Sequence, residues 1–216
     1  GGGRDNPGIH SIIIDEENSL KLSVGISCAG FFRTIDGGKT WAPLNKGVTA
    51  DFIPDKNPEV GQDPHFIAAS PSNPKILWQQ NHCGIFRSIN DGESWTKISQ
   101  ENGPAGFGFS ITLDETNENT AYVVPLTADQ NRVPIKNAMC VSKTTDGGKT
   151  WSVLLNGIPL KDCYDMVLRH AMDIKKNTLI MGTTTGNLYA SFDAGENWTL
   201  LSCHLPPIYS VRFINE

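Results

Sequence analysis

The sequence predicts an all-β protein assembled from four repeats of about fifty residues, and three observations predict it. One eight-residue motif occurs four times, with its third position at residues 36, 90, 146 and 193. The runs between the motifs are short, rich in Ile, Val, Phe and Thr, and bounded by Gly, Pro, Asn and Asp, which is typical of strands and turns. No convincing helical periodicity is present. A period of about 50 residues is typical of repeat architectures built from one small supersecondary unit.

The motif reads Ser/Thr-x-Asp/Asn-x-Gly-x-Thr/Ser/Asn-Trp, and each position has a structural role. The Asp or Asn accepts hydrogen bonds from backbone N–H groups of its own turn, and the Gly tolerates a positive φ. The Trp anchors the outgoing strand against a neighbouring sheet. Because the second copy has Asn90 in place of an acid, the motif favours a structural role over ion binding. The predicted structural residues are Asp36, Gly38, Trp41, Asn90, Gly92, Trp95, Asp146, Gly148, Trp151, Asp193, Gly195 and Trp198.

These motifs resemble the Asp-box, also called the BNR repeat, in all four units. The resemblance implies a β-propeller with each box in the hairpin between the third and fourth strands of a blade. Sialidases, xyloglucan hydrolases, sortilin-type receptors and a photosystem assembly factor share the box, so it predicts architecture and leaves the chemistry open. Beyond the box, the chain resembles bacterial BNR-repeat proteins that carry a glycosyl hydrolase label. Residues 80–84, Gln-Asn-His-Cys-Gly, and the connection over residues 50–61 carry that resemblance.

Each blade is expected to contain four strands, the fourth of which follows the motif. The blades are expected at residues 8–45, 64–99, 106–155 and 167–202. The expected strands are 10–15, 20–26, 30–33 and 41–44 in the first blade and 65–69, 75–78, 84–87 and 95–98 in the second. They are 107–113, 121–126, 138–143 and 151–155 in the third blade and 169–174, 178–182, 187–190 and 198–201 in the fourth. The breakers at 70–74 and 114–119 predict turns between first and second strands.

One further strand is expected at residues 208–213, spaced like the first strand of a fifth blade. The N-terminal residues 1–7 have the composition of a loop, so they supply no partner for it. The sequence therefore predicts an incomplete propeller that is the C-terminal part of a larger one. Because unpaired sheet edges associate readily, two explanations stay open: missing N-terminal blades, or a homo-oligomer that supplies the strands.

Composition excludes several classes of partner. The net charge is −5, and no basic cluster is present, so we expect no nucleic-acid binding. No apolar run approaches the roughly 20 residues of a membrane span, so no membrane partner is expected. The five cysteines are odd in number and form no CxxC pair, which predicts unpaired thiols, no structural metal and a reducing compartment such as the cytoplasm. No cofactor is predicted.

The candidate site lies on the loop face that carries the connections between blades. The first connection, residues 45–64, is the longest and most acidic, and the 79–83 loop replaces a smaller loop of the first blade with bulky polar groups. Long loops on a rigid scaffold commonly carry function. The predicted ligand-binding residues are His65, Asn81, His82 and Arg169.

Each of these residues also has a structural interpretation. Asn81 and His82 could satisfy backbone groups in a tight loop, and Arg169 could pair with Asp165. Asp51 and Glu59 are the candidate catalytic residues, as the paired carboxylates of a glycoside hydrolase.

Function is thus divided between two classes. One is a non-catalytic propeller that binds a carbohydrate or a protein, and the other is a glycoside hydrolase that uses loop-face carboxylates. Sialidase activity is disfavoured, because residues 32–35 and 86–89 match the Phe-Arg-Ile-Pro segment of sialidases only at their first two positions. Two carboxylates facing each other about 5–10 Å apart would favour hydrolysis.

Overall fold

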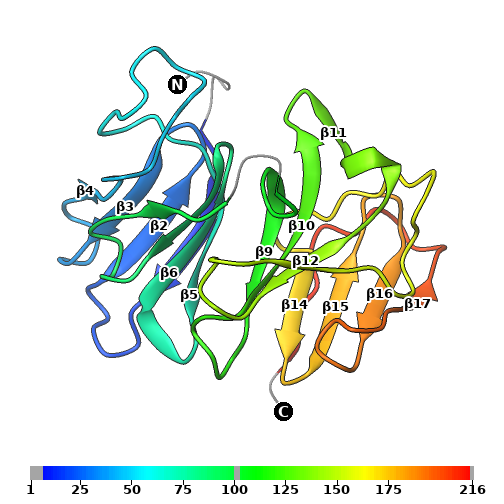
Figure 1. Ribbon diagram of the computed structural model, residues 1–216. Helices are drawn as coiled ribbons and strands as arrows, with labels where there is room; N and C mark the ends of the chain where they lie inside the picture. Colours follow the sequence, from blue (N-terminus) through cyan, green and yellow to red (C-terminus); the bar gives the residue numbers. More distant parts are fainter. Residues whose placement is uncertain (1–6, 100–102, 215–216) are drawn as a thin grey trace.

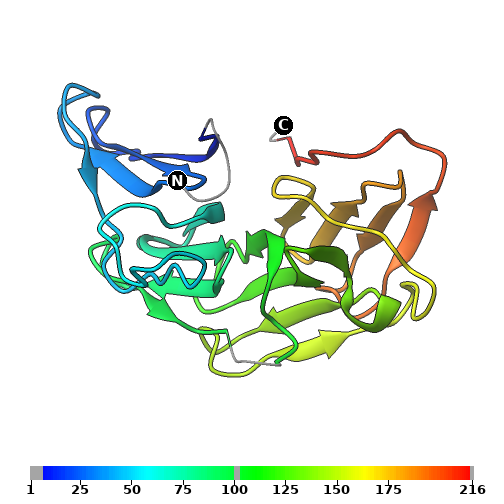
Figure 2. The same ribbon diagram turned by 90° about the horizontal axis from the view of Figure 1, so that it is seen from above.

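Four antiparallel sheets follow one another round an arc in the computed structural model, which describes residues 7–99 and 103–214. Figure 1 shows the sheets side by side, and Figure 2 shows the arc from above, with both chain ends on its open side. Radially arranged four-stranded sheets are the architecture of a β-propeller. The predicted fold class is therefore confirmed. Among the described residues, no helix has the length and apolar character needed to span a membrane.

Each sheet is a meander, so neighbours in sequence are neighbours in space. The first sheet contains β1 (Ile9–Ile14), β2 (Leu22–Ile26), β3 (Gly30–Thr34) and β4 (Ala42–Pro43), and the second contains β5 (Pro64–Ser70), β6 (Asn73–Asn81), β7 (Gly84–Ser88) and β8 (Thr96–Lys97). The third contains β9 (Gly108–Leu113), β10 (Ala121–Ala128), β12 (Val141–Thr144) and β13 (Ser152–Leu154). The fourth contains β14 (Met172–Lys175), β15 (Thr178–Gly182), β16 (Leu188–Ser191) and β17 (Thr199–Ser202).

The third sheet differs from the others by an added hairpin. Strand β11 (Asn131–Pro134) pairs with the end of β10, and the 3-10 turn η1 (Ile135–Asn137) follows. β10 is long enough for this because it extends beyond its pairing with β9 and β12. The hairpin rises at the same end of the molecule as the long connection between β4 and β5 (Figure 1).

The repeated motif forms the same turn in every sheet, between the third and fourth strands. In the first copy, the Thr34 hydroxyl accepts the Gly38 amide at 2.9 Å, and Asp36 accepts the amide and hydroxyl of Thr40 at 2.9 and 2.6 Å. Gly38 has a φ of 90°, a left-handed conformation that favours glycine. The backbone N–H of Gly37 also donates to Leu20 O in the turn between β1 and β2, which places both kinds of turn at one end.

The core consists of apolar clusters between adjacent sheets. The motif tryptophans contribute to them: Trp95 packs edge-on against Phe31 of the preceding sheet at 5.6 Å, and its indole N–H donates to Leu44 O. Trp198 is buried in the same way between the third and fourth sheets, and Trp151 packs partly buried between the second and third. The prediction that each motif Trp packs against a neighbouring sheet is wrong for Trp41, which is 42% exposed, because no sheet of the described residues packs on that side of the first sheet.

The predicted strand at 208–213 is present as an extended segment with one parallel bridge, between His170 and Ser210. It lies along the innermost edge of the fourth sheet. The backbone N–H of Val211 donates to His170 O, and that of Phe213 donates to a carboxylate oxygen of Asp173. Besides this bridge, the segment is held by the backbone N–H of Ile208, which donates to Thr183 O beyond the end of β15.

Candidate functional site

A polar cavity of about 210 Å³ lies where the first blade connection meets the β10–β11 hairpin. Its walls include Phe52, Asp63, His65, His82, Arg132 and Arg169. These residues come from the first connection, β5, the β6–β7 turn, the β10–β11 hairpin and the segment before β14. Several sheets therefore contribute to one small site on the loop face.

Local pairing brings an acid and two histidines together. Pro64 pairs with Asn81 across β5 and β6, so Asp63 lies beside His82, whose backbone N–H donates to Asp63 O at 3.0 Å. Asp63 and His65 are two residues apart in extended chain, so their side chains point to the same side. As a result, the Asp63 carboxylate lies 3.7 Å from His65 Nε2 and 3.6 Å from His82 Nδ1.

Hydrogen bonds to the backbone hold His65 and Asp63, the two neighbours of His82, in place. His65 is 2% exposed, and its Nδ1–H donates to Gly108 O at 2.6 Å. The second oxygen of Asp63 accepts the Cys28 amide at 3.1 Å. Burial by itself would raise the pKa of the Asp63 carboxyl, but its contacts with His65, His82 and the Cys28 amide outweigh burial and hold the pKa well below its usual range. Asp63 is therefore an ionised carboxylate at neutral pH.

Arginine and aromatic side chains form the rest of the wall. The guanidinium groups of Arg132 and Arg169 lie 5.2 and 5.0 Å from the centre of the Phe109 ring, on which His65 also stacks at 4.6 Å. Cation–π contacts of this kind hold a cation over an aromatic ring. Arg132 is paired with Asp129 through two nitrogens. Arg169 thus adds a positive charge to the same cavity as the two histidines.

Of the residues that the sequence predicted as ligand-binding, three meet in this cavity: His65, His82 and Arg169. Asn81 does not line it. Its side-chain oxygen accepts the Cys83 amide and its nitrogen donates to Gln79 Oε1, so Asn81 serves the turn, as the structural interpretation proposed. Asp165, the partner that the structural interpretation gave to Arg169, accepts hydrogen bonds from Thr185 and from Asn187.

Asp51 and Glu59, the candidate catalytic pair, are both exposed and are not among the residues that line the cavity. The backbone N–H of Asp51 donates to Cys83 Sγ, and Glu59 O accepts from Asn45. Asp63, which was not among the predicted site residues, is the carboxylate that lies beside the two histidines. The Asp-x-His pattern at the start of a strand was a signal for it, because residues two apart in a strand share a face.

Comparison with known proteins connects this geometry to a fold. No protein-family model matches the chain, and no curated protein is similar to it in sequence. Among solved structures, an ancestral GH74 enzyme matches with a TM-score of 0.62 and 17% identity, over 88% of this chain and 23% of that chain. The GH74 xyloglucanase from Xanthomonas campestris matches with a TM-score of 0.59 and 19% identity, over 88% of this chain and 29% of that chain.

A GH74 enzyme from Niastella koreensis matches with a TM-score of 0.54 and 19% identity, over 89% of this chain and 30% of its own. The chain has the fold of these propellers. It spans less than a third of the length of each of them. At these identities the similarity shows the fold alone.

Proposed function

We propose that this chain is an Asp-box propeller that binds a polar carbohydrate unit in the cavity of Asp63, His82 and Arg169, without hydrolysing it. The observation that carries the proposal is the composition of that cavity. Charged and hydrogen-bonding groups converge there beside the Phe52 and Phe109 rings, and a few polar groups placed among aromatic side chains are typical of small-molecule sites. The volume of about 210 Å³ lies below the roughly 300 Å³ at which drug-sized sites begin, so one small unit fits.

The repeated turn supports the assignment to the Asp-box repeat. All four copies occupy equivalent hairpins and use the same hydrogen bonds. The Ser/Thr hydroxyl at the first position donates to the side-chain oxygen at the third, and that oxygen accepts the backbone N–H of the residue four positions further on. The fold of the GH74 xyloglucanase from Xanthomonas campestris is consistent with a carbohydrate as the ligand class.

The carboxylates of the cavity favour binding over hydrolysis. A glycosidase needs one carboxylic acid whose pKa is raised so that it can protonate the leaving group. The pKa of Asp63 is lowered, and Asp129 is engaged by Arg132. Hydrolysis by Asp51 and Glu59 has less support, because both side chains are exposed to solvent outside the cavity.

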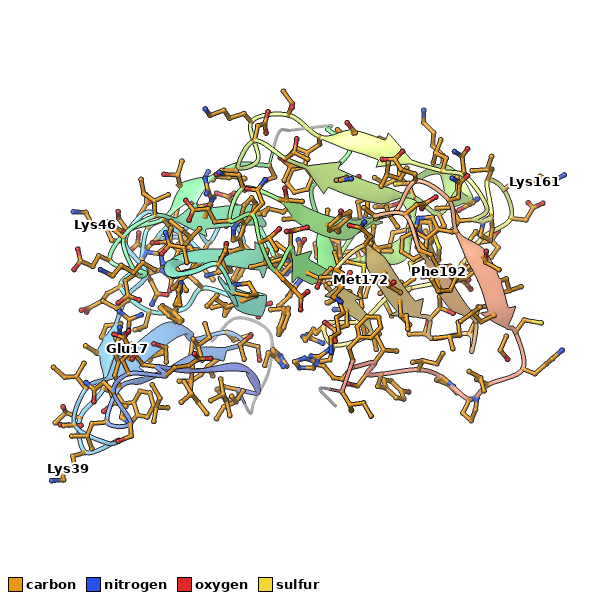
Figure 3. The ribbon with its side chains drawn as sticks, turned by 90° about the horizontal axis from the view of Figure 1, so that it is seen from below. Glu17, Lys39, Lys46, Lys161, Met172 and Phe192 are labelled. Atoms are coloured by element: carbon orange, nitrogen blue, oxygen red, sulfur yellow. The ribbon has the colours of Figure 1, made fainter. Side chains whose placement is uncertain are left out.

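The proposal is tested by ligand-observed NMR with D-glucose, D-xylose and D-glucuronic acid, together with xyloglucan oligosaccharides. Saturation transfer to at least one of these probes is expected with the wild-type chain. Arg169→Ala is expected to weaken that binding at least tenfold, since it removes a charge from the wall. Lys161→Ala is the matched control, because Lys161 projects from the outer edge of the molecule (Figure 3) and is not among the residues that line the cavity.

Equal binding by the Arg169→Ala and wild-type chains, or no binding of any probe, would overturn the proposal. Release of reducing ends from xyloglucan by the wild-type chain would favour the hydrolase instead.

A further inference from the structure

Three potential metal-ligating atoms converge on one point at the edge of the cavity. They are Asp63 Oδ2, His65 Nε2 and His82 Nδ1, and all three lie within 4.8 Å of one another. Two imidazole nitrogens and one carboxylate oxygen are a donor set that zinc accepts in proteins. The sequence predicted no metal, because of the cysteine spacing and of Asn90 in the second motif, and it did not identify Asp63 as the partner of the two histidines.

The spacing of these atoms is that of ligands around a cation. A direct N–H···O hydrogen bond would bring nitrogen and oxygen to about 2.7–3.2 Å. The observed separations from Asp63 Oδ2 are 3.7 Å to His65 and 3.6 Å to His82. Two ligands bound to zinc at about 2.05 Å in tetrahedral geometry lie about 3.3 Å apart. The two Asp63–histidine separations exceed this spacing by about 0.3–0.4 Å. The two histidine nitrogens lie within 4.8 Å of each other, so the imidazole rings would approach each other on zinc binding.

The orientation of His65 is the second, independent observation. Because Gly108 O can only accept, His65 Nδ1 carries the proton, and Nε2 is the nitrogen that faces Asp63. Metal-bound histidines almost always donate their other N–H to a carbonyl or carboxylate in this way. Nε2 is therefore the ring nitrogen that is available to a metal ion, on the side where Asp63 Oδ2 lies.

The other two ligands are also held in place. The His82 ring packs edge-on against Phe52 at 4.8 Å and Phe107 at 5.8 Å. Asp63 Oδ1 is occupied by the Cys28 amide, which leaves Oδ2 for the site. Ligands fixed before the metal arrives lose little conformational entropy on binding.

We propose that Asp63, His65 and His82 bind one zinc ion with three protein ligands, leaving the fourth position open toward the cavity that Arg169 also lines. Structural zinc sites have four protein ligands, whereas sites with three keep a position for water or for an oxygen of a ligand. The zinc site does not depend on the proposed carbohydrate function, since metal binding is measurable with no sugar present.

The test uses the full chain without a histidine tag, freed of metal with EDTA and titrated with Zn²⁺ by calorimetry. One zinc per chain is expected. His82→Ala and Asp63→Asn are each expected to weaken binding at least a hundredfold, and circular dichroism checks that both are folded. His204→Ala is the matched control, because Cys203 Sγ and His204 Nε2 lie 3.5 Å apart on the surface and form the competing explanation.

Unchanged affinity in His82→Ala and Asp63→Asn, or loss of binding in His204→Ala, would overturn the proposal. If neither site variant folds, the visible absorption spectrum of Co²⁺ bound to the wild-type chain tests the site. Intense visible bands of tetrahedral cobalt with nitrogen and oxygen ligands support the site, while a spectrum of hydrated cobalt or of cobalt bound by a thiolate overturns it. Zinc binding without any sugar binding would refute the proposed function and leave the metal site standing.

Discussion

At the scale of single residues, the side chain at the third position of the repeated turn is held by several short hydrogen bonds. Asp146 accepts the hydroxyl of Thr150 at 2.6 Å and its amide at 3.0 Å, and it accepts the hydroxyl of Thr144 at 2.9 Å. The hydroxyl of Thr150, followed by its amide, lowers the pKa of Asp146 to about 2 from 3.8. These bonds favour the charged form, although the side chain is open to solvent.

We expect an NMR titration of the Asp146 carboxyl to give a midpoint of about 2. Because the pKa of Asp146 is lower in the folded than in the unfolded chain, its ionised carboxylate stabilises the folded state fully above pH 3.8. This contribution is lost as the pH falls through about 2. Asp146→Asn should keep the turn, because Asn90 makes the same bonds in the second copy, with its Nδ2 donating to Ser94. A normal midpoint for Asp146, or an unfolded Asp146→Asn chain, would contradict this account.

At the scale of elements, apolar side chains that pack between adjacent sheets hold the sheets together, and the motif tryptophans are among them. The turn after β7 delivers Trp95 onto Phe31 of the preceding sheet, where it is 4% exposed. The equivalent turn after β3 delivers Trp41 to a face that no sheet of the described residues covers. The same local motif therefore contributes differently to stability in the two sheets.

Trp95→Ala should lower the free energy of unfolding by about 3–5 kcal/mol, as expected for a buried aromatic side chain replaced by Ala. Trp41→Ala should change it by only about 0.5 kcal/mol, as expected for an exposed side chain. Urea unfolding followed by circular dichroism measures both. Equal losses in the two variants would show that Trp41 is covered in solution.

At the scale of the whole molecule, the C-terminal segment is joined to the fourth sheet through His170. The Arg212 guanidinium donates to the carbonyl oxygen of His170 at 3.0 Å and lies 3.1 Å from its Nδ1. Burial, and then the charges of Arg212 and Arg169, lower the pKa of His170 below its ordinary 6.5. The histidine is thus neutral when the segment is docked.

Since the folded pKa of His170 is depressed, its contribution to stability is present above 6.5 and is lost as the pH falls toward the folded value. We expect the amides of Val211 and Phe213 to exchange faster at pH 5.5 than at pH 7.5, after correction for the intrinsic rate. His170→Gln should remove this pH dependence, since Gln carries no titrating group. A pH dependence of the same size in His170→Gln would assign the effect to another residue.

The candidate site divides between what was predictable and what was not. The sequence predicted His65, His82 and Arg169 as site residues. The order of strands and loops along the chain was enough to place these polar residues at strand ends on the loop face. Asp63 was missed because its role depends on the pairing of β5 with β6, which sets His82 beside it from a position 19 residues away. Asp51 and Glu59 were chosen for their charge, yet the path of the connection leaves both side chains in solvent.

By itself, the sequence determined the all-β class, the four repeats and the turn within each repeat. The sequence was sufficient for these features because the side-chain hydrogen bonds of the turn close within four residues, as from Gly38 to Thr34 and from Thr40 to Asp36. Only the tertiary structure decided which Trp is buried, that residues 131–134 form a strand, and that one carboxylate meets two histidines. Those outcomes depend on contacts between sheets and across strands, where the energy comes from residues far apart in the chain.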